Sequence, residues 1–136
     1  GLKWDKENLV IDDKELFTHD EALKLAKSLN KRLPSLKEFK ELIDTGTTYD
    51  KVKRGRWFGL DSNLLEKSEK SIFMPAAGER NYYDGSVYYT GDYGYYWSST
   101  VDGDYGRGVD FDSSYVSADN YFYRANGMSV RCVAEF

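Results

Sequence analysis

Two helix-start signals stand close together in the first third of the chain and constrain its fold more than any other feature. Thr18 with Glu21, and Ser35 with Glu38, both fit the capping box, in which a hydroxyl caps a backbone N–H and the glutamate reaches back. Gly46 interrupts the apolar spacing that follows, so we predict two consecutive helices before it. Their apolar residues are Ala22, Leu25, Ala26 and Leu29 in the first, and Leu36, Phe39, Leu42 and Ile43 in the second.

The rest of the chain has short apolar runs separated by polar and glycine-containing loops, a pattern typical of β-strands. The predicted strands are Leu2–Trp4, Leu9–Ile11, Arg56–Leu60, Ser71–Met74, Val87–Tyr89 and Tyr95–Trp97. Two helices followed by many strands predict an α+β fold with a mostly antiparallel, multi-stranded sheet region. Nothing marks a linker, so we expect a single domain over residues 1–136, long enough to bury a core.

The last third of the chain alternates apolar and polar residues, the period of a half-buried strand. The closing segment predicts one strand face with Met128, Val130 and Cys132 and an opposite, polar face with Ser129 and Arg131. A second segment places Val109 and Phe111 toward the core and Asp110 and Asp112 away from it. The adjacent aromatic residues Tyr95, Tyr96 and Trp97 are assigned to the core.

The interval from Thr100 to Asn126 consists largely of Tyr, Asp, Ser, Asn and Gly. Tyrosine offers a large amphipathic surface at a small cost in rotamer entropy, and the small polar residues supply adaptable hydrogen bonds, as in antibody paratopes. The interval is therefore predicted to be a contact surface. The candidate ligand-binding residues are Asp102, Asp104, Tyr105, Arg107, Asp110, Asp112, Ser114, Tyr115, Ser117, Asp119, Asn120, Tyr121 and Tyr123.

Charge and composition exclude several classes of partner. The net charge is −4, and Lys and Arg are outnumbered 4 to 9 by Asp and Glu from Ser71 onward, against 15 to 14 up to Lys70. An acidic surface repels phosphate groups, so we expect no nucleic-acid partner. There is no apolar run of about 18 residues, so no membrane insertion is expected. The chain begins at Gly1 rather than Met, as expected of a trimmed or processed domain.

The single cysteine, Cys132, excludes an internal disulfide and a cysteine-based zinc cluster. Its place among valines predicts a buried, inert side chain. His19 lies in the first turn of the first helix beside two acidic residues, where we expect it to be solvated. Asp110 and Asp112 lie two apart on one strand and offer a pair of carboxylates, but such pairs are more often a solvated face than acid–base catalysts. No nucleophile, base and orienting group stand at a recognisable spacing, so no catalytic residue is predicted.

Three ordered motifs carry a resemblance to known families. Lys31-Arg32-Leu33-Pro34-Ser35, followed by Glu38-Phe39, resembles a turn of the C-type-lectin-like superfamily, which formylglycine-generating enzymes and diversity-generating-retroelement variable proteins share. The segments 74–80 (MPAAGER), 94–100 (GYYWSST) and 129–133 (SVRCV) resemble the Fibrobacter succinogenes major paralogous domain. That domain is abundant in Bacteroidetes surface proteins and their phages.

The resemblance implies a C-type-lectin-like fold with both chain ends paired in one sheet, two flanking helices and a second small sheet that displays ligand-binding residues. In the retroelement relatives, the diversified residues lie between a tryptophan-serine motif and the terminal strand, here Thr100 to Asn126. The resemblance also implies an extracellular, cell-surface or virion location and a protein or glycan ligand on another surface.

Two activities of the wider superfamily are not expected. Formylglycine-generating enzymes need a pair of cysteines, and this chain has one. Sugar-binding lectins carry Glu-Pro-Asn or Gln-Pro-Asp with Trp-Asn-Asp, whereas here Pro75 follows Met74, and Trp97 precedes a serine. Asp102, Asp104 and Asp112 offer hard oxygen ligands for calcium only if the fold gathers them, so neither a metal nor another cofactor is predicted.

The sequence therefore predicts a non-catalytic recognition domain that binds a macromolecular partner through residues 100–126. It is a candidate diversified receptor-binding domain of a phage or bacterial surface. A fixed surface or pilus-associated glycan-binding module (an adhesin) is the alternative, and an enzyme of the formylglycine-generating type is less favoured. Neither the identity of the ligand nor the oligomeric state can be read from the residues.

Overall fold

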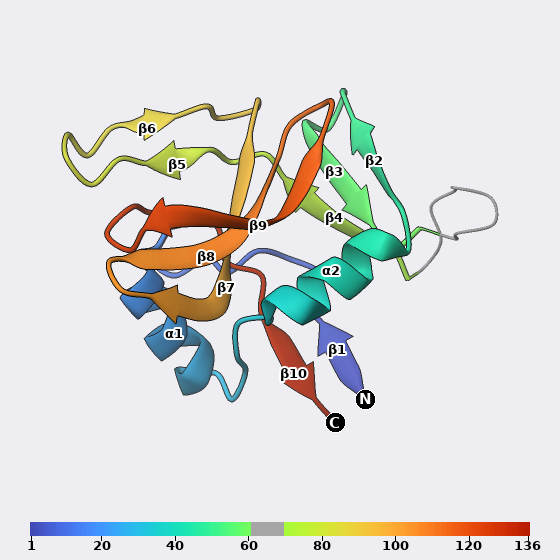
Figure 1. Ribbon diagram of the computed structural model, residues 1–136, viewed down its shortest axis with the longest axis horizontal. Helices are drawn as coiled ribbons and strands as arrows, with labels where there is room; N and C mark the ends of the chain where they lie inside the picture. Colours follow the sequence, from blue (N-terminus) through green and yellow to red (C-terminus); the bar gives the residue numbers. More distant parts are fainter. Residues whose placement is uncertain (61–69) are drawn as a thin grey trace.

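A computed structural model describes residues 1–60 and 70–136 and has an α+β fold (Figure 1). The two helices are α1 (His19–Ser28) and α2 (Leu36–Asp44). The strands are β1 (Leu2–Trp4), β2 (Thr47–Asp50), β3 (Gly55–Phe58), β4 (Ile72–Pro75), β5 (Glu79–Arg80), β6 (Val87–Tyr88), β7 (Gly94–Asp102), β8 (Tyr105–Phe111), β9 (Val116–Tyr123) and β10 (Val133–Glu135). Neither described helix has the length and apolar character needed to cross a membrane.

Both predicted helices are confirmed, and both begin with a complete capping box. Glu21 N donates to Thr18 Oγ1 at 3.3 Å while Thr18 N donates to Glu21 Oε1 at 2.9 Å, and Ser35 and Glu38 repeat the exchange. Asn30 has a φ of 58°, and this left-handed residue turns the chain out of α1.

The described strands form small antiparallel sheets, which confirms the sheet prediction in outline. Strand β1 pairs with β10, and β5 pairs with β6. One three-stranded sheet consists of β2, β3 and β4, and the other consists of β7, β8 and β9. Figure 1 shows the two chain ends side by side on the far side of the helices from β5 and β6. The structure adds three strands that were not predicted, β2, β5 and β9. The predicted strand Leu9–Ile11 is not formed, because Leu9 N makes a single hydrogen bond to Val130 O and Ile11 pairs with Lys14.

Two hydrophobic clusters form the core, and strand β7 contributes to both. Successive side chains of a strand point to opposite faces, so Trp97 enters the cluster beneath α1 and its neighbour Tyr96 enters the cluster with Phe39 and Phe111. Trp97 Nε1 donates to a backbone oxygen at 2.7 Å, as does the Tyr96 hydroxyl. Tyr96 and Trp97 are confirmed as core, whereas Tyr95 is only half-buried.

The segment from Met128 to Val133 differs from its prediction as a strand, because only Val133 lies in one (β10), and Met128 and Ser129 form isolated bridges. Met128, Val130 and Cys132 are buried as predicted, but Ser129 and Arg131 on the supposed polar face are buried too. Met128, Val130 and Cys132 belong to the cluster beneath α1, while Ser129 pairs with Tyr96 and Arg131 bonds Phe73, so neither face meets solvent. The Arg131 guanidinium replaces its lost water with hydrogen bonds to Asn8 Oδ1 at 2.6 and 2.9 Å and to the backbone oxygens of Asp5 and Phe73. Burial raises the pKa of the Cys132 thiol to about 11, as expected of an inert side chain.

His19 also differs from its prediction, because it is fully buried rather than solvated. Its Nε2 lies 2.7 Å from the carbonyl oxygen of Ser98, and its ring meets Trp97 edge-on with centroids 5.0 Å apart. The Nδ1 atom is buried without a hydrogen-bond partner among the described residues. Desolvation by this burial lowers the pKa of His19, so the imidazole is neutral in the folded protein.

Candidate functional site

The β8–β9 hairpin and the β7–β8 turn carry the predicted contact residues. Gly103 and Asp104 form the two-residue loop between β7 and β8, with Gly103 in the left-handed conformation at a φ of 63°. On β8, a Cβ at Gly106 would lie 2.6 Å from the Trp97 ring, so glycine is required where the strand crosses the core. The neighbouring Tyr105 and Arg107 are therefore free to point to the opposite, outer face.

Four exposed tyrosines gather on this outer surface, and we call Tyr82, Tyr105, Tyr121 and Tyr123 the tyrosine cluster. The rings of Tyr105 and Tyr123 stack with centroids 5.2 Å apart, because the two residues are directly paired across β8 and β9. Tyr121 meets Tyr105 edge-on at 6.0 Å, and Tyr82 meets Tyr123 at 5.3 Å. Each ring is between 39% and 53% exposed, so the cluster is ordered by its own contacts and still open to a partner.

Arg107 and Asp119 fix one edge of the tyrosine cluster. Arg107 Nε donates to Asp119 Oδ1 at 2.7 Å, and the second carboxylate oxygen accepts from a terminal nitrogen of the same guanidinium. The guanidinium also lies over the Tyr121 ring, 4.2 Å from its centroid. The Asp119 hydrogen bond raises the pKa of Arg107, so the guanidinium keeps its charge. The arrangement limits the rotamers of three predicted contact residues before any ligand arrives.

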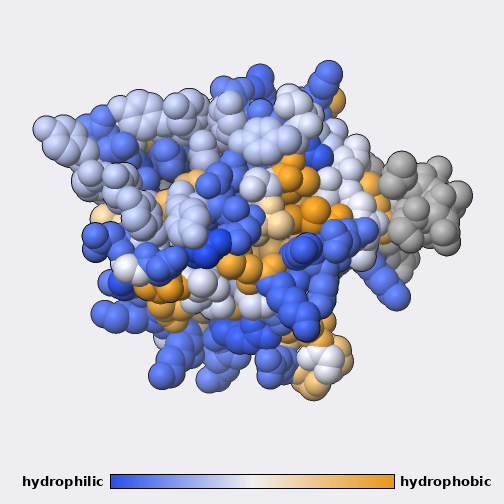
Figure 2. Space-filling model, viewed as in Figure 1, coloured by the Kyte–Doolittle hydropathy of each residue, from blue (hydrophilic) through white to orange (hydrophobic). Residues whose placement is uncertain are grey.

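A second row of aromatic rings, of which only Phe122 belongs to the predicted interval, runs from β6 toward the core. Tyr88 contacts Tyr89, Tyr89 and Tyr93 contact Tyr95, and Tyr95 meets Phe122 edge-on at 5.6 Å. Repeated tyrosine pairs in the sequence, such as residues 88–89, are the signal that points to this row. Figure 2 shows side chains of intermediate hydropathy over β5, β6 and β9, with apolar side chains visible closer to α2.

A cavity of about 380 Å³ lies between the two groups of rings. Tyr95 and Phe122 from the second row line it on one side, and three members of the tyrosine cluster line the other. Its polar groups are the carboxylates of Glu79 and Asp110 and the amides of Asn120 and Asn126. Strands β5, β7, β8 and β9 thus all contribute to one hollow in the surface.

Asp110 lies at this cavity and is only 5% exposed, so the prediction that it faces solvent is wrong. β8 has buried side chains on both faces at this point. The carboxylate accepts from the Tyr115 hydroxyl at 2.6 Å and from Asn120 Nδ2 at 3.2 Å. The Asp110 hydrogen bond raises the pKa of Tyr115, so the phenol remains a donor. Tyr115 and Asn120 therefore hold Asp110 in place.

Glu79 is the site residue that sequence reasoning misses. It lies on β5, outside the predicted interval, and no residue pattern near it marks a binding role. Burial raises the pKa of the Glu79 carboxyl, and no lysine or arginine of residues 1–60 and 70–136 forms an ion pair with it. Burial and then the charges of Glu79 and Asp110 raise the pKa of Tyr95, which places the three groups around one space.

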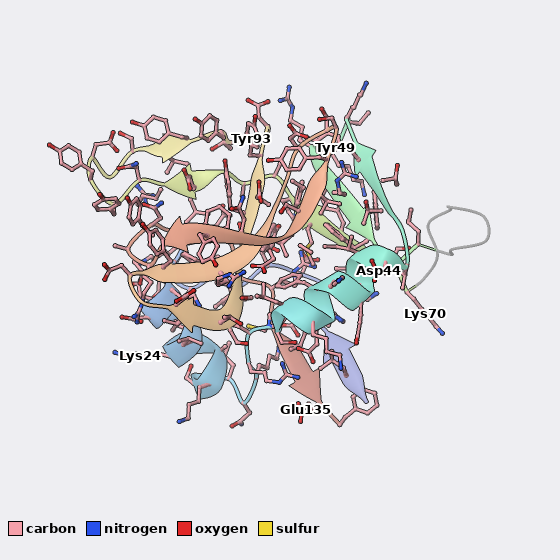
Figure 3. The ribbon with its side chains drawn as sticks, in the orientation of Figure 1. Lys24, Asp44, Tyr49, Lys70, Tyr93 and Glu135 are labelled. Atoms are coloured by element: carbon pink, nitrogen blue, oxygen red, sulfur yellow. The ribbon has the colours of Figure 1, made fainter. Side chains whose placement is uncertain are left out.

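The β8–β9 turn residues have a structural role. Asp112 Oδ1 accepts from the backbone nitrogens of Ser114 and Tyr115 and from the Ser114 hydroxyl, which closes the turn. Asp112 therefore points into its own turn. Asp112 also borders a second, larger cavity of about 610 Å³, together with Tyr49 and Tyr93. Figure 3 labels these two tyrosines at the edge of the molecule opposite Glu135.

The remaining predicted residues lie apart from the cavity. Asp102 stands 4.0 Å from the Arg107 guanidinium, Asp104 borders a third hollow beside Arg124, and Ser117 pairs with Asp110 across the hairpin. Asp112 lies at the opposite end of β8 from Asp102 and Asp104, so the fold does not gather the three carboxylates. Within the part of the chain that is described, no three metal-ligating side chains form a group.

Comparison with known proteins yields one match. A family model described as "Domain of unknown function (DUF8237)" matches residues 40–133, which include both aromatic groups and the cavity between them. No curated protein and no solved structure matches the chain. The matched residues make up more than half of the 136 residues. The chain therefore belongs to the DUF8237 family.

Proposed function

We propose that this protein is a non-catalytic recognition domain that binds a macromolecular partner through the tyrosine cluster and its Arg107–Asp119 edge. The observation that carries the proposal is a set of exposed rings already fixed by mutual contacts and by a two-point ion pair. Preorganised aromatic side chains lose little conformational entropy on binding, and tyrosine and arginine are enriched among residues that dominate interface energies.

The scaffold supports this role because the rings stand on paired strands rather than on a free loop. Tyr105, Tyr121 and Tyr123 are held in register by the β8–β9 ladder, and glycine at position 106 anchors β8 against the core. Sites on rigid elements hold their geometry better than sites on loops. The scaffold we propose is a C-type-lectin-like fold, supported by the paired chain ends, the two helices and the separate sheet with the candidate contact residues.

A catalytic role has less support. The imidazole of His19 is buried against Trp97, away from the cavity lining. Both oxygens of Asp110 accept hydrogen bonds from neighbouring side chains, and Cys132 is a buried thiol whose pKa is raised by burial to about 11. A general base or a nucleophile needs an accessible reactive atom beside a partner that activates it.

We further propose that the domain acts at a cell or virion surface and that its contact residues are diversified. Adenine-directed mutagenesis of asparagine codons yields Asn, Asp, Tyr, Ser, Gly and a few others, and residues 102–126 are dominated by that set. Sequencing the 3′ end of the gene in several isolates tests this directly. We expect a nearby template repeat and a reverse-transcriptase gene, with changes at codons 104, 105, 117 and 119–121. An invariant 3′ end without a template copy would instead identify a fixed glycan-binding module or another fixed adhesin.

The binding proposal is tested with an array of glycans and a display library of bacterial surface proteins, followed by variants measured against whichever partner binds. Tyr121→Ala and Tyr105→Ala should each weaken binding by about 1–3 kcal/mol without a change in unfolding temperature. Lys24→Ala and Lys40→Ala on the helices are the controls and should bind normally. If the lysine changes weaken binding and the tyrosine changes do not, the contact surface lies elsewhere.

A further inference from the structure

The cavity between the two aromatic groups has an unusual charge distribution. Its lining includes two carboxylates, Glu79 and Asp110, and no lysine or arginine. No ion pair neutralises either carboxylate within residues 1–60 and 70–136. A half-buried carboxylate without a counter-ion is costly to maintain, because it has lost water and gained no positive charge in return.

We infer that this cavity receives the ammonium group of a lysine side chain on a protein partner, an assignment that rests on the recognition role proposed above and specifies its chemistry. Glu79 supplies the counter-charge and Asp110 adds a second negative charge behind it. The cavity volume of about 380 Å³ accommodates a lysine side chain.

The aromatic walls suit the two parts of such a side chain. Tyr95 and Phe122 meet edge-on and line the cavity, so their ring surfaces offer contact area to the methylene stem. Ring faces also attract a cation through their negative quadrupole, and this attraction is strongest where water is excluded. A carboxylate beside aromatic rings therefore binds an ammonium more favourably than either feature does alone.

The hydrogen-bonding groups favour an ammonium over a sugar or a metal ion. The side chains of Tyr115 and Asn120 already donate to Asp110, which leaves Glu79 as the acceptor without a donor. The amides and tyrosine hydroxyls of the lining could also serve a sugar, but a sugar is neutral, and only a donor with positive charge offsets the burial of the Glu79 carboxylate. Calcium needs six or more oxygen ligands, and the cavity offers two carboxylates, one of them engaged.

The surroundings of Glu79 give the binding reaction a signature in protons. Burial raises the pKa of Glu79, and the titratable groups that face it are Tyr95 on β7, Asp110 on β8 and Tyr88 directly across on β6. None of these groups carries a positive charge. An ammonium that enters the cavity must therefore draw the Glu79 pKa down, so binding releases protons and weakens as the pH falls through the pKa of free Glu79.

The test is a titration of the whole domain with N-acetyl-lysine methylamide, in which binding is measured from the NMR chemical shifts of the Tyr95 and Phe122 rings. N-acetyl-norleucine methylamide, which keeps the stem and lacks the charge, should bind at least tenfold more weakly. Glu79→Gln should weaken the lysine probe at least tenfold. Glu41→Gln removes the same charge from the exposed face of α2 and should leave binding unchanged. Affinity for the wild type should fall with falling pH, and the Glu79→Gln variant should lose most of that dependence.

Three results would overturn the inference. They are equal binding of the two probes, a Glu79→Gln variant that binds the lysine probe normally, and binding of glucosamine where the lysine probe fails, which would make the ligand a glycan. Failure of every probe also rejects the cavity as a cation site. Tyr82 is the member of the tyrosine cluster that does not line the cavity, so loss of macromolecular binding in Tyr82→Ala tests the recognition role apart from the cavity chemistry.

Discussion

The carboxylates near the helices and chain ends differ from the two carboxylates at the cavity in their partners. On the side of the helices and chain ends, the Arg32 guanidinium makes two 2.7 Å bonds to Glu38 and one of 2.9 Å to Glu135, and Lys31 bonds Asp5. On the side of β5, β8 and β9, Glu79 and Asp110 lie at one cavity with no cation beside them among the described residues. Both sides contain partly buried charge, so burial alone does not explain the difference.

The difference separates charges that close the fold from charges that remain available. The Arg32 bridge ties the turn before α2 to the last strand, and its partners are satisfied within the chain. Neither cavity carboxylate has a cation as a partner among the described residues, and Glu79 also lacks a hydrogen-bond donor, so its burial has a cost in stability. Substitution of the paired charges should therefore destabilise the fold, whereas removal of the Glu79 charge should leave it stable.

The largest effect is expected at Arg131, a buried guanidinium whose hydrogen bonds are all made to neutral oxygens within the chain. Arg131→Ala leaves the carbonyl oxygens of Asp5 and Phe73 and the Asn8 side chain without their donor, and it opens a space in the core. We expect the free energy of unfolding to fall by about 3 kcal/mol, measured by urea denaturation. Arg80→Ala, at an exposed arginine, is the control and should cost less than about 1 kcal/mol. A loss of similar size at both positions would remove the distinction.

His19 is the exception on the helical side, because its Nδ1 lacks a partner within the described residues. Burial is the main cause of its lowered pKa, and the charge of Arg124 adds to it while Ser98 and Asp20 oppose it. The unfolded chain binds a proton at this residue below about pH 6.5 and the folded chain binds it only at lower pH, so stability is present above about pH 6.5 and falls as the pH decreases. The slope is at most about 1.4 kcal/mol per pH unit.

Urea denaturation between pH 7 and pH 5 checks this expectation. His19→Phe keeps a flat ring against Trp97 and has no titrating group, so its stability should fall less steeply than that of the wild type. An identical slope in the two proteins would show that other groups, such as acidic residues with shifted pKa values, cause the pH dependence.

A smaller effect on stability is expected at Glu38. Its pH dependence is the opposite of that of a carboxyl whose pKa is raised by folding. The Arg32 hydrogen bonds lower the pKa of Glu38 to about 2, so its contribution is complete above the ordinary carboxyl pKa of about 4.5 and is lost as the pH falls toward 2. Solvent screens this partly exposed pair, so Glu38→Gln should cost about 1 kcal/mol at pH 7. The cost should vanish near pH 2. Glu41→Gln on the same helix should have no measurable effect at either pH, and an equal loss there would reject the role of Arg32.

The smallest effect is expected at Glu79. Its folded pKa is raised, so the ionised carboxyl lowers stability at pH 7, and Glu79→Gln should leave the free energy of unfolding unchanged or raise it by less than about 0.5 kcal/mol. Thermal and urea unfolding of the variant measure this change. A loss above about 1 kcal/mol would show that Glu79 is a structural residue and would end the contrast between the two sides.

The parts of the fold that follow from local chemistry were predictable from sequence. Each capping box joins residues three apart, so Thr18 and Glu21 form the same contacts in almost any α1 that begins there. The alternation in β8 likewise predicts the buried Val109 and Phe111, and the run of adjacent aromatic residues in β7 predicts the buried Tyr96 and Trp97.

The errors involve residues whose partners are distant in the chain. His19 meets Ser98, and Arg131 meets Asn8, so local acidity around the first and local alternation around the second give the wrong exposure. The period of two also fails where a segment is covered on both faces, as Asp110 and Ser129 show. Glu79 belongs to the site only because β5 lies near β7 and β8, and no signal along the chain encodes that approach.

The edge-on contact between Trp97 and His19, 5.0 Å between ring centroids, gives the protein an internal optical reporter. A protonated imidazole quenches the fluorescence of an indole that it touches, whereas a neutral imidazole quenches it weakly. The emission of Trp97 should therefore stay bright while His19 remains neutral inside the fold, and the contact itself is lost when the chain unfolds. Trp97 also contacts Phe122, which lines the cavity, so one ring separates this indole from the proposed lysine site.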